Sequence, residues 1–98
     1  MSARYPVLLH LAGRDCLVVG GGNVAERKVQ GLLGVGARVT VIAPTTTDRI
    51  AQDAADGALR WERRPFLVED LDPRTLGVDR WWFVVSATDD VELNATIA

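Results

Sequence analysis

Apolar residues gather along the chain in short runs that are typical of buried strands. The runs at positions 16–19, 39–43 and 81–85 consist mainly of branched, aromatic or small apolar residues, the pattern of strands covered on both faces. A more exposed strand is expected at 58–63, where apolar and polar residues alternate. A short leading strand is expected at 6–11.

Helices are expected between these strands. The apolar residues of segment 24–33 fall on or near one face of a helix, and Gly34 and Gly36 can end that helix. A second helix is expected to start at a threonine cap, either Thr46 or Thr47, and to stop at Gly57.

The second half of the chain contains fewer regular elements. Segment 65–78 is polar and interrupted by prolines, so a loop with one short helical turn is expected. A last helix is expected from Val91, capped by Asp89 or Asp90. Because the sequence reaches Ala98 without a stop signal for this helix, we expect the chain to be part of a larger protein.

Two tryptophans open the run at 81–85. Trp81 and Trp82 are expected to pack on opposite faces of that strand. A stacking role against a cofactor is disfavoured, because they stand at the beginning of the strand and ligands bind at the other end.

Strands that alternate with helices predict an α/β domain with a mainly parallel sheet. We therefore expect residues 1–98 to form one Rossmann-type dinucleotide-binding domain, truncated at its C-terminal end. In such folds the ligand lies at the carboxyl ends of the strands.

Three consecutive glycines separate the strand at 16–19 from the helix that follows. Gly20, Gly22 and Ala25 match the pattern G-x-G-x-x-A. The first glycine allows the tight turn, the second leaves room for a pyrophosphate beside the backbone, and the alanine lets the helix pack on the strand.

The helix start after the glycines gives a second reason to expect an anion. The N–H groups of its first turn, near Asn23 and Val24, have no partner within the helix, and the helix dipole is positive there. The pattern favours a dinucleotide. Two alternatives stay open: a tight turn without a ligand, and another ligand that carries a phosphate or an adenosyl group.

The end of the second strand leaves the choice between NAD and NADP open. An NAD site commonly has Asp or Glu at this point, bonded to the ribose, but the sequence has apolar residues and proline at 42–44. Arg38 has approximately the spacing of an NADP contact, yet it stands at the opposite end of the strand. Thr45 and Thr46 could supply hydroxyl groups instead.

The composition is that of an ordinary globular domain. Of 98 residues, 48% are hydrophobic and 24% are charged, and the net charge is -2. Lysine and arginine never exceed two in a row, so no nucleic-acid partner is expected. The apolar run near the N-terminus is broken by His10 and is too short to span a membrane, so no membrane partner is expected.

Cys16 is the only cysteine, which excludes an intrachain disulfide and favours a reducing compartment such as the cytoplasm. His10 is the only other soft metal ligand. Two such residues do not make a structural zinc site, so no metal site is expected and Cys16 is interpreted as a small core residue.

Three segments in order resemble the amino-terminal part of the siroheme synthase family. They are YPVLLHLAGRDCLVVGGGNVAERK, then GARVTVIAPT, then VVSATDDVELN, and together they cover nearly the whole chain. This combination is far more specific than the glycine pattern. The resemblance implies a precorrin-2 dehydrogenase that oxidises precorrin-2 to sirohydrochlorin with NAD. In many members of the family the protein also inserts ferrous iron as a ferrochelatase, and some are fused to a methyltransferase.

The resemblance also implies which residues contact NAD and what lies elsewhere. The contacts fall in three turns that follow strands: Gly20, Gly21, Gly22, Asn23 and Val24, then Pro44 and Thr45, then Ser86, Ala87 and Thr88. Family members are homodimers. Their catalytic aspartate lies on an N-V-x-D segment that would come after Ala98, so the catalytic residue is unknown here and these 98 residues alone are expected to be inactive.

Two other functions stay open. One is an NAD-sensing or otherwise non-catalytic nucleotide-binding module, and the other is a non-catalytic remnant that partners a methyltransferase. The glycine pattern alone fits all of these functions, whereas the segment VVSATDDVELN favours the dehydrogenase.

Several polar residues have two interpretations each. Arg27 and Lys28 are either a solvated helix face or cations near the carboxylates of a tetrapyrrole. Asp89 and Asp90 could form an acid–base pair, but a helix cap is favoured. Asn94 could face the nicotinamide or support that cap.

Overall fold

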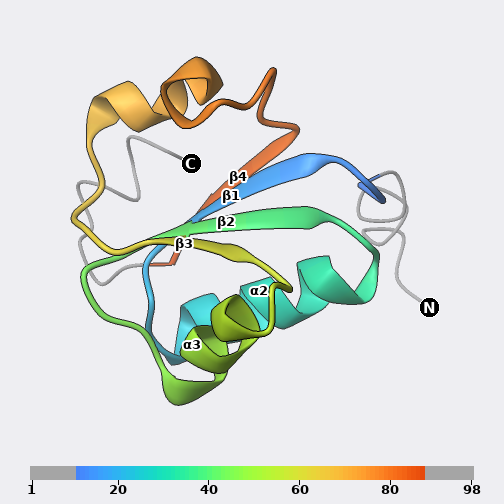
Figure 1. Ribbon diagram of the computed structural model, residues 1–98, viewed down its shortest axis with the longest axis vertical. Coiled ribbons are helices and arrows are strands. Elements are labelled where there is room, and N and C mark those ends of the chain that lie inside the picture. The colour runs from blue at the N-terminus through green and yellow to red at the C-terminus, as the bar shows by residue number, and fades with distance from the viewer. Residues whose placement is uncertain (1–10, 88–98) are drawn as a thin grey trace.

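Four parallel strands form the centre of the fold in the computed structural model, which describes residues 11–87 (Figure 1). The strands are β1 (Asp15–Val19), β2 (Arg38–Ile42), β3 (Arg60–Glu62) and β4 (Phe83–Ser86), in the order β3-β2-β1-β4 across the sheet. β1 pairs with β2 on one side and with β4 on the other. The predicted α/β architecture with a parallel sheet is confirmed.

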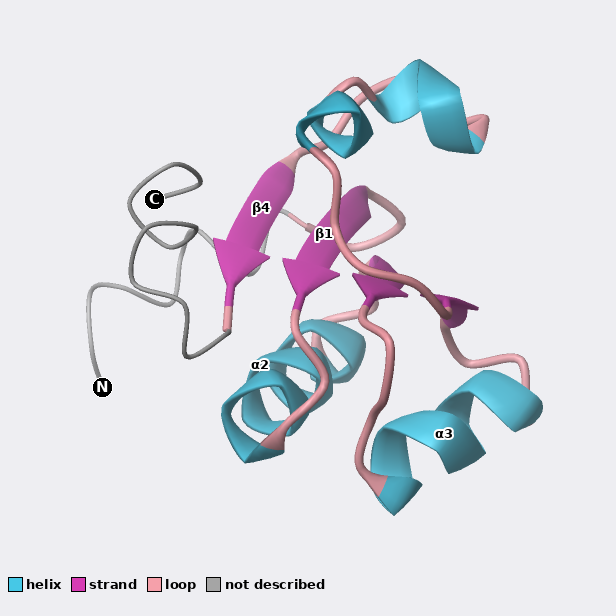
Figure 2. Cartoon of the chain, turned by 90° about the vertical axis from the view of Figure 1, so that its left-hand side faces the viewer, coloured by secondary structure: helices cyan, strands magenta, loops and turns pink. Residues whose placement is uncertain are grey.

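Helices cover both faces of this sheet (Figure 2). α2 (Asn23–Gly34) and α3 (Asp48–Ala55) lie on one face, and the 3-10 helices η1 (Val68–Leu71) and η2 (Pro73–Leu76) lie on the other. The chain changes face where it crosses from β3 at one edge back to β4 beyond β1. The strand order therefore reverses beside β1, and the carboxyl ends of β1 and β4 flank the crevice in which folds of this class bind ligands.

All side chains of β1 and β2 except the first of each strand are buried, and the apolar ones belong to two clusters. One joins Cys16, Val18, Val39 and Val41 to residues of α2 and α3, and the other joins Leu17, Val19 and Ile42 to Leu76 of η2. Both faces of each strand are thus covered, which explains why the sequence shows uninterrupted apolar runs rather than alternation.

Cys16 is a core residue, as expected. Its side chain is fully buried in the first cluster. Burial, with a smaller contribution from the charge of Asp15, raises the pKa of the Cys16 thiol to about 11. The thiol therefore stays protonated near neutral pH and behaves as a small apolar side chain.

The predicted helices form close to the expected positions. α2 extends one residue beyond the predicted segment at each end. Thr47, rather than Thr46, caps α3: its Oγ1 accepts a hydrogen bond from the Ile50 N–H at 3.3 Å. The leading strand expected at 6–11 falls outside the described residues except for Leu11, which is part of a turn.

Two predictions about the second half need correction. Segment 65–78 contains two 3-10 helices rather than one helical turn. The last strand begins at Phe83, not at Trp81, because Phe83 pairs with Cys16 near the start of β1. The two tryptophans therefore precede the strand and do not pack on its opposite faces.

Each tryptophan has its own partners ahead of β4. The Trp81 indole N–H donates to the Asp70 carbonyl at 3.0 Å. Trp82 is 41% exposed, and the guanidinium carbons of Arg14 and Arg80 lie 3.8 and 3.9 Å from its ring centre. Cation–π contacts of this kind retain an exposed indole at the surface.

A buried carboxylate fixes the connection between β3 and β4. Asp70 is 3% exposed, and it accepts two hydrogen bonds from the Arg64 guanidinium, at 2.8 and 2.7 Å. It also accepts one from the Leu67 N–H at 2.8 Å. The Arg64 hydrogen bond, more than any other contact, holds the pKa of Asp70 below its ordinary value.

We predict that Asp70→Asn destabilises the fold by about 2 kcal/mol at neutral pH. Breaking a buried pair is costly, but the Arg64 side chain is 32% exposed and water reduces the loss. Because the folded pKa of Asp70 is depressed, its contribution is complete above the unfolded pKa of about 3.9 and is lost as pH falls through the folded value.

Urea unfolding at neutral pH and in strong acid measures this difference. The difference in the free energy of unfolding between wild type and Asp70→Asn should disappear in acid. Asp72→Asn is the control, because the pair of Asp72 with Arg74 is exposed and should matter little. A difference in the free energy of unfolding that is the same at both pH values would contradict the role given to the ionised Asp70 carboxylate.

Candidate functional site

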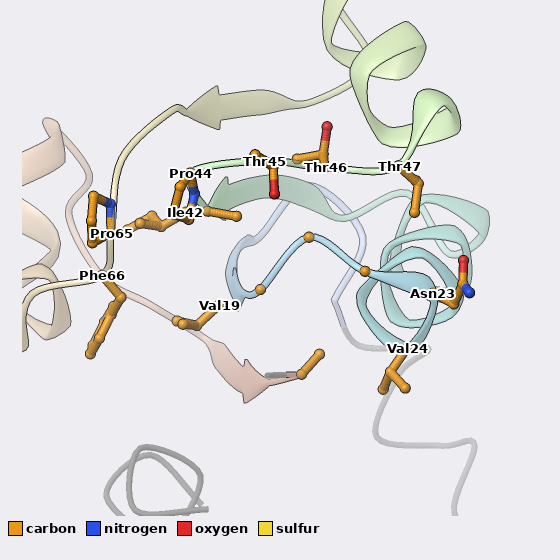
Figure 3. Close-up of a pocket in the computed structure, with 15 residues that line it drawn as sticks. Val19, Asn23, Val24, Ile42, Pro44, Thr45, Thr46, Thr47, Pro65 and Phe66 are labelled. Atoms are coloured by element: carbon orange, nitrogen blue, oxygen red, sulfur yellow. The ribbon is translucent and has the colours of Figure 1, made fainter. Parts of the chain in front are cut away.

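A cleft of about 810 Å³ opens at the carboxyl ends of the strands (Figure 3). Residues 19–24 after β1 form one wall, and residues 42–47 after β2 form the other. Pro65 and Phe66, which follow β3, and Ala87, which follows β4, complete the lining. The cleft therefore lies where the strand order predicts a ligand.

The cleft collects most of the residues that the sequence predicts for NAD. These are Gly20, Gly21, Gly22, Asn23, Val24, Pro44, Thr45 and Ala87. Ser86 is the last residue of β4, next to the cleft, and is not among the residues that line it. Thr88 lies outside the described residues.

Sequence reasoning assigned no ligand contact to six residues of the lining, namely Val19, Ile42, Ala43, Thr47, Pro65 and Phe66. Thr46 was expected as a possible hydroxyl donor, and it also lines the cleft. Thr46 and Thr47 extend the wall after β2, and Pro65 and Phe66 close the end beside β3. No motif marks the last two. They follow a parallel strand, however, so the rule that ligands lie at carboxyl ends could have indicated them.

The first two glycines are required by the protein itself. Gly20 has a φ of 121°, which a residue with a side chain rarely adopts. A Cβ on Gly21 would lie 2.0 Å from the Thr45 carbonyl oxygen, where no atom can fit. The two loops are also joined by the Thr47 N–H, which donates to the Gly21 carbonyl at 2.8 Å. The positive φ of Gly20 and the tight approach of the two walls at Gly21 therefore explain these two glycines without a ligand.

Gly22 is different, because nothing in the described part of the protein requires it. Its φ is -86°, which any residue can adopt, and a Cβ there would meet no atom within 4 Å. The residue is exposed and faces the cleft. The open space beside its backbone is the space that a bound group would occupy.

The start of α2 supplies hydrogen-bond donors beside Gly22. The first helical hydrogen bond runs from the Glu26 N–H to the Gly22 carbonyl at 2.9 Å, so the helix does not use the N–H groups at 23–25. Gly22 caps the helix without a side-chain hydrogen bond. Ala25 is fully buried against the sheet, which brings the helix start close to β1. A helix start with unused N–H groups close to the sheet suits an anion.

The threonines after β2 point in different directions (Figure 3). The Thr45 hydroxyl is directed toward the glycine loop, whereas Thr46 points away from it. Thr46 Oγ1 is buried without a hydrogen-bond partner within residues 11–87, and Thr47 is used as the cap of α3. Thr45 is thus the threonine placed to donate to a ligand in the cleft.

The residues of segment 11–87 that line the cleft carry no charge. Arg38 was the candidate for binding the extra phosphate of NADP, but it lies at the opposite end of β2. Its Nη2 is 2.7 Å from Asp15 Oδ2. An anion in the cleft would therefore be held by backbone N–H groups and the helix dipole rather than by a cationic side chain.

The described residues offer neither a metal site nor a membrane span. Between positions 11 and 87, no group of three or more His, Cys, Asp or Glu side chains is placed to hold a metal ion. Among the same residues no helix has the length and apolar character needed to cross a membrane.

The geometry of the cleft fits a dinucleotide. The cleft extends from Phe66, after β3, to Ala87, after β4. Between them, the N–H groups at Gly22–Val24 can donate to a diphosphate, and the Thr45 hydroxyl can bond a ribose. Apolar residues at both ends, Phe66 and Ala87, suit the flat rings of such a ligand.

The chain is similar over most of its length to proteins named precorrin-2 dehydrogenase and siroheme synthase. It is 44% identical over 90 residues to a precorrin-2 dehydrogenase of Priestia megaterium, covering 92% of this chain and 41% of that protein. It is 41% identical over 93 residues to a siroheme synthase of Salmonella dublin, covering 95% of this chain and 19% of that one. The chain thus spans less than half the length of these relatives.

A solved structure gives the same result. The protein named "SirC, precorrin-2 dehydrogenase" matches with a TM-score of 0.73 and 40% sequence identity, over 90% of this chain and 42% of that chain. A family model, NAD_binding_7, described as "Putative NAD(P)-binding", matches residues 7–98. The chain therefore belongs to this NAD(P)-binding family, and its homologues include precorrin-2 dehydrogenases and siroheme synthases.

Proposed function

We propose that this chain is the NAD-binding domain, residues 1–98, of a precorrin-2 dehydrogenase of siroheme biosynthesis. The open space at Gly22, beside the unused N–H groups of α2, carries the cofactor part of the proposal. The similarity to named precorrin-2 dehydrogenases carries the substrate part.

The proposed position of NAD follows from the cleft. The diphosphate lies on the backbone of the glycine loop and the start of α2, at Gly20, Gly21, Gly22, Asn23 and Val24. The adenosine half extends toward Pro44 and Thr45, and the nicotinamide half toward Ser86, Ala87 and Thr88. This direction follows from the strand order, since the two halves of a dinucleotide lie on either side of β1.

The chain contributes binding and orientation to the reaction. NAD, when bound, supplies the acceptor for the hydride that leaves the reduced macrocycle. The glycine loop fixes the diphosphate, and the apolar ends of the cleft hold the rings, so that the two reactants meet in one geometry. The described lining contains no titratable side chain. We therefore propose that the proton acceptor, the aspartate implied by the family resemblance, lies outside the described residues.

The proposal includes the properties of the full-length protein. We propose a cytoplasmic homodimer, with ferrous iron as a second substrate where the ferrochelatase activity is retained. The name of the siroheme synthases among the relatives supports the insertion of iron. The homodimer is proposed from the family resemblance, and the cytoplasm from the single cysteine. A non-catalytic NAD-sensing module is less favoured, because the relatives that are 44% and 40% identical to this chain are named as enzymes.

Turnover by the full-length protein tests the proposal. Precorrin-2 and NAD should give NADH, measured by its near-ultraviolet absorbance, together with the absorption spectrum of sirohydrochlorin. Binding of NAD without any turnover would favour the sensing module instead.

We predict that Gly22→Val abolishes NAD binding while the domain still folds. A branched side chain meets no protein atom there, so the fold tolerates it, but it occupies the space of the diphosphate. Gly34→Val is the matched control, because Gly34 also has open space and lies at the far end of α2. Calorimetric titration with NAD and circular dichroism measure the two effects, and unchanged affinity in folded Gly22→Val would refute the assignment of this loop.

We also predict that NAD binds at least tenfold more tightly than NADP at physiological salt. The extra phosphate of NADP would enter a wall without a cation, since Arg38 is paired with Asp15 at the other end of β2. The Thr45 hydroxyl can bond a ribose but cannot neutralise a phosphate dianion. Competition binding of the two cofactors measures the preference, and tighter binding of NADP would overturn it.

A further inference from the structure

A second groove, of about 540 Å³, runs along α2 on the side that faces β4. Its residues are Val24, Arg27, Lys28, Gly31 and Leu32 of α2, with Phe83 and Val85 of β4. The α2 positions are spaced by three or four and so share one face of the helix. Val24 lines both this groove and the cofactor cleft, so the two meet at the start of α2.

The groove combines an apolar floor with a cationic rim. Leu32 is buried, and Phe83 and Val85 are half-buried, so the floor is apolar but still accessible. Arg27 and Lys28 are exposed on the rim. Such a surface suits a ligand that has both a flat apolar ring and anionic arms.

The two rim cations also lack carboxylate partners within residues 11–87. Most other arginines of this part of the chain are neutralised: Arg38, Arg49, Arg60, Arg64 and Arg74 each form an ion pair with Asp or Glu. Arg27 and Lys28 form none of the ion pairs found there. Their charge is therefore available to an anion that enters the groove.

The groove opens at the end of the cleft where the nicotinamide would lie. The adenosine half of a dinucleotide extends along β2, and the other half extends toward Ala87, after β4. Phe83 and Val85 belong to that same strand. A substrate that reacts at the nicotinamide can therefore place its peripheral arms along α2.

We infer that this groove binds the carboxylate arms of the tetrapyrrole substrate, and that Arg27 and Lys28 bind these carboxylates. The inference rests on the proposed function. Precorrin-2 is a macrocycle with acetate and propionate arms, so its apolar ring and anionic rim match the floor and the rim of the groove. The two residues contribute to substrate affinity and take no part in the hydride step.

Binding of uroporphyrin III to the full-length protein tests the inference. This stable porphyrin carries acetate and propionate arms, and its fluorescence reports binding. Arg27→Gln and Lys28→Gln should each weaken binding about threefold, and the double variant about tenfold, as for exposed charge pairs. Arg80→Gln is the matched control, since Arg80 also lacks a carboxylate partner in the described range but stacks on Trp82, which precedes β4 at the amino end of that strand, away from the cofactor cleft at the carboxyl end.

Kinetics provide the second readout. The double variant should raise the KM for precorrin-2 about tenfold and leave kcat and the KM for NAD unchanged. Unchanged porphyrin affinity and an unchanged KM, in an enzyme that still oxidises precorrin-2, would overturn the inference while the proposed function stands. A wild-type protein that binds NAD but oxidises no precorrin-2 would instead overturn the proposed function.

The groove could also be a contact for another segment of the protein or for a second copy. The double variant would then change the thermal stability or the mass measured by light scattering, and porphyrin affinity would stay the same. That result also overturns the inference.

Discussion

The close approach of Gly21 to the Thr45 carbonyl is the contact on which the cofactor site depends. No side chain fits between these two backbones. Hydrogen bonds from the Thr47 N–H to Gly21 and from the Gly20 N–H to Ile42 join the same two loops. Because Thr47 also caps α3, one contact sets the path of the chain after β1, the path after β2 and the start of a helix. The position of the α2 N-terminus, and with it the anion site, follows from this packing.

The described lining of the cleft carries no charge, which is consistent with an anion site made of backbone N–H groups. Backbone N–H groups hold an anion without a cationic side chain, so the cleft can be lined by threonine, proline and apolar residues. The cations near the site stand outside it, on the rim of the groove beside α2. In the proposed function, this separation assigns the cofactor to one part of the molecule and the anionic substrate to another part.

The sequence predicts the centre of the fold well, because the physical signals there are local. β1 and β2 are covered on both faces, and their apolar runs show it. The glycine pattern and the helix that follows it identify the anion site, since both depend on neighbouring residues. The start of β4 could not be predicted in this way: Trp81 and Trp82 are as apolar as the strand, and only the pairing of Phe83 with Cys16 decides where the strand begins.

Contacts between distant segments explain the rest of what the sequence left open. The need for Gly21 arises from Thr45, which belongs to the next loop, so the pattern alone gave no reason for this glycine. The role of Arg27 and Lys28 stayed ambiguous because the floor of their groove comes partly from β4. Pro65 and Phe66 join the cleft only through the position of β3 in the sheet.

An NMR titration with NAD tests most directly whether the glycine loop and the start of α2 bind the cofactor. It follows the backbone amide resonances of the isotope-labelled protein. If the glycine loop and the helix start bind the diphosphate, the largest shifts should fall on the amides of Gly22, Asn23 and Val24, with a smaller shift at Thr45. The amides of Gly34 and Arg80, far from the cleft, should change little. Large shifts confined to residues outside the cleft, with the amides of Gly22 to Val24 unchanged at saturating NAD, would contradict the account.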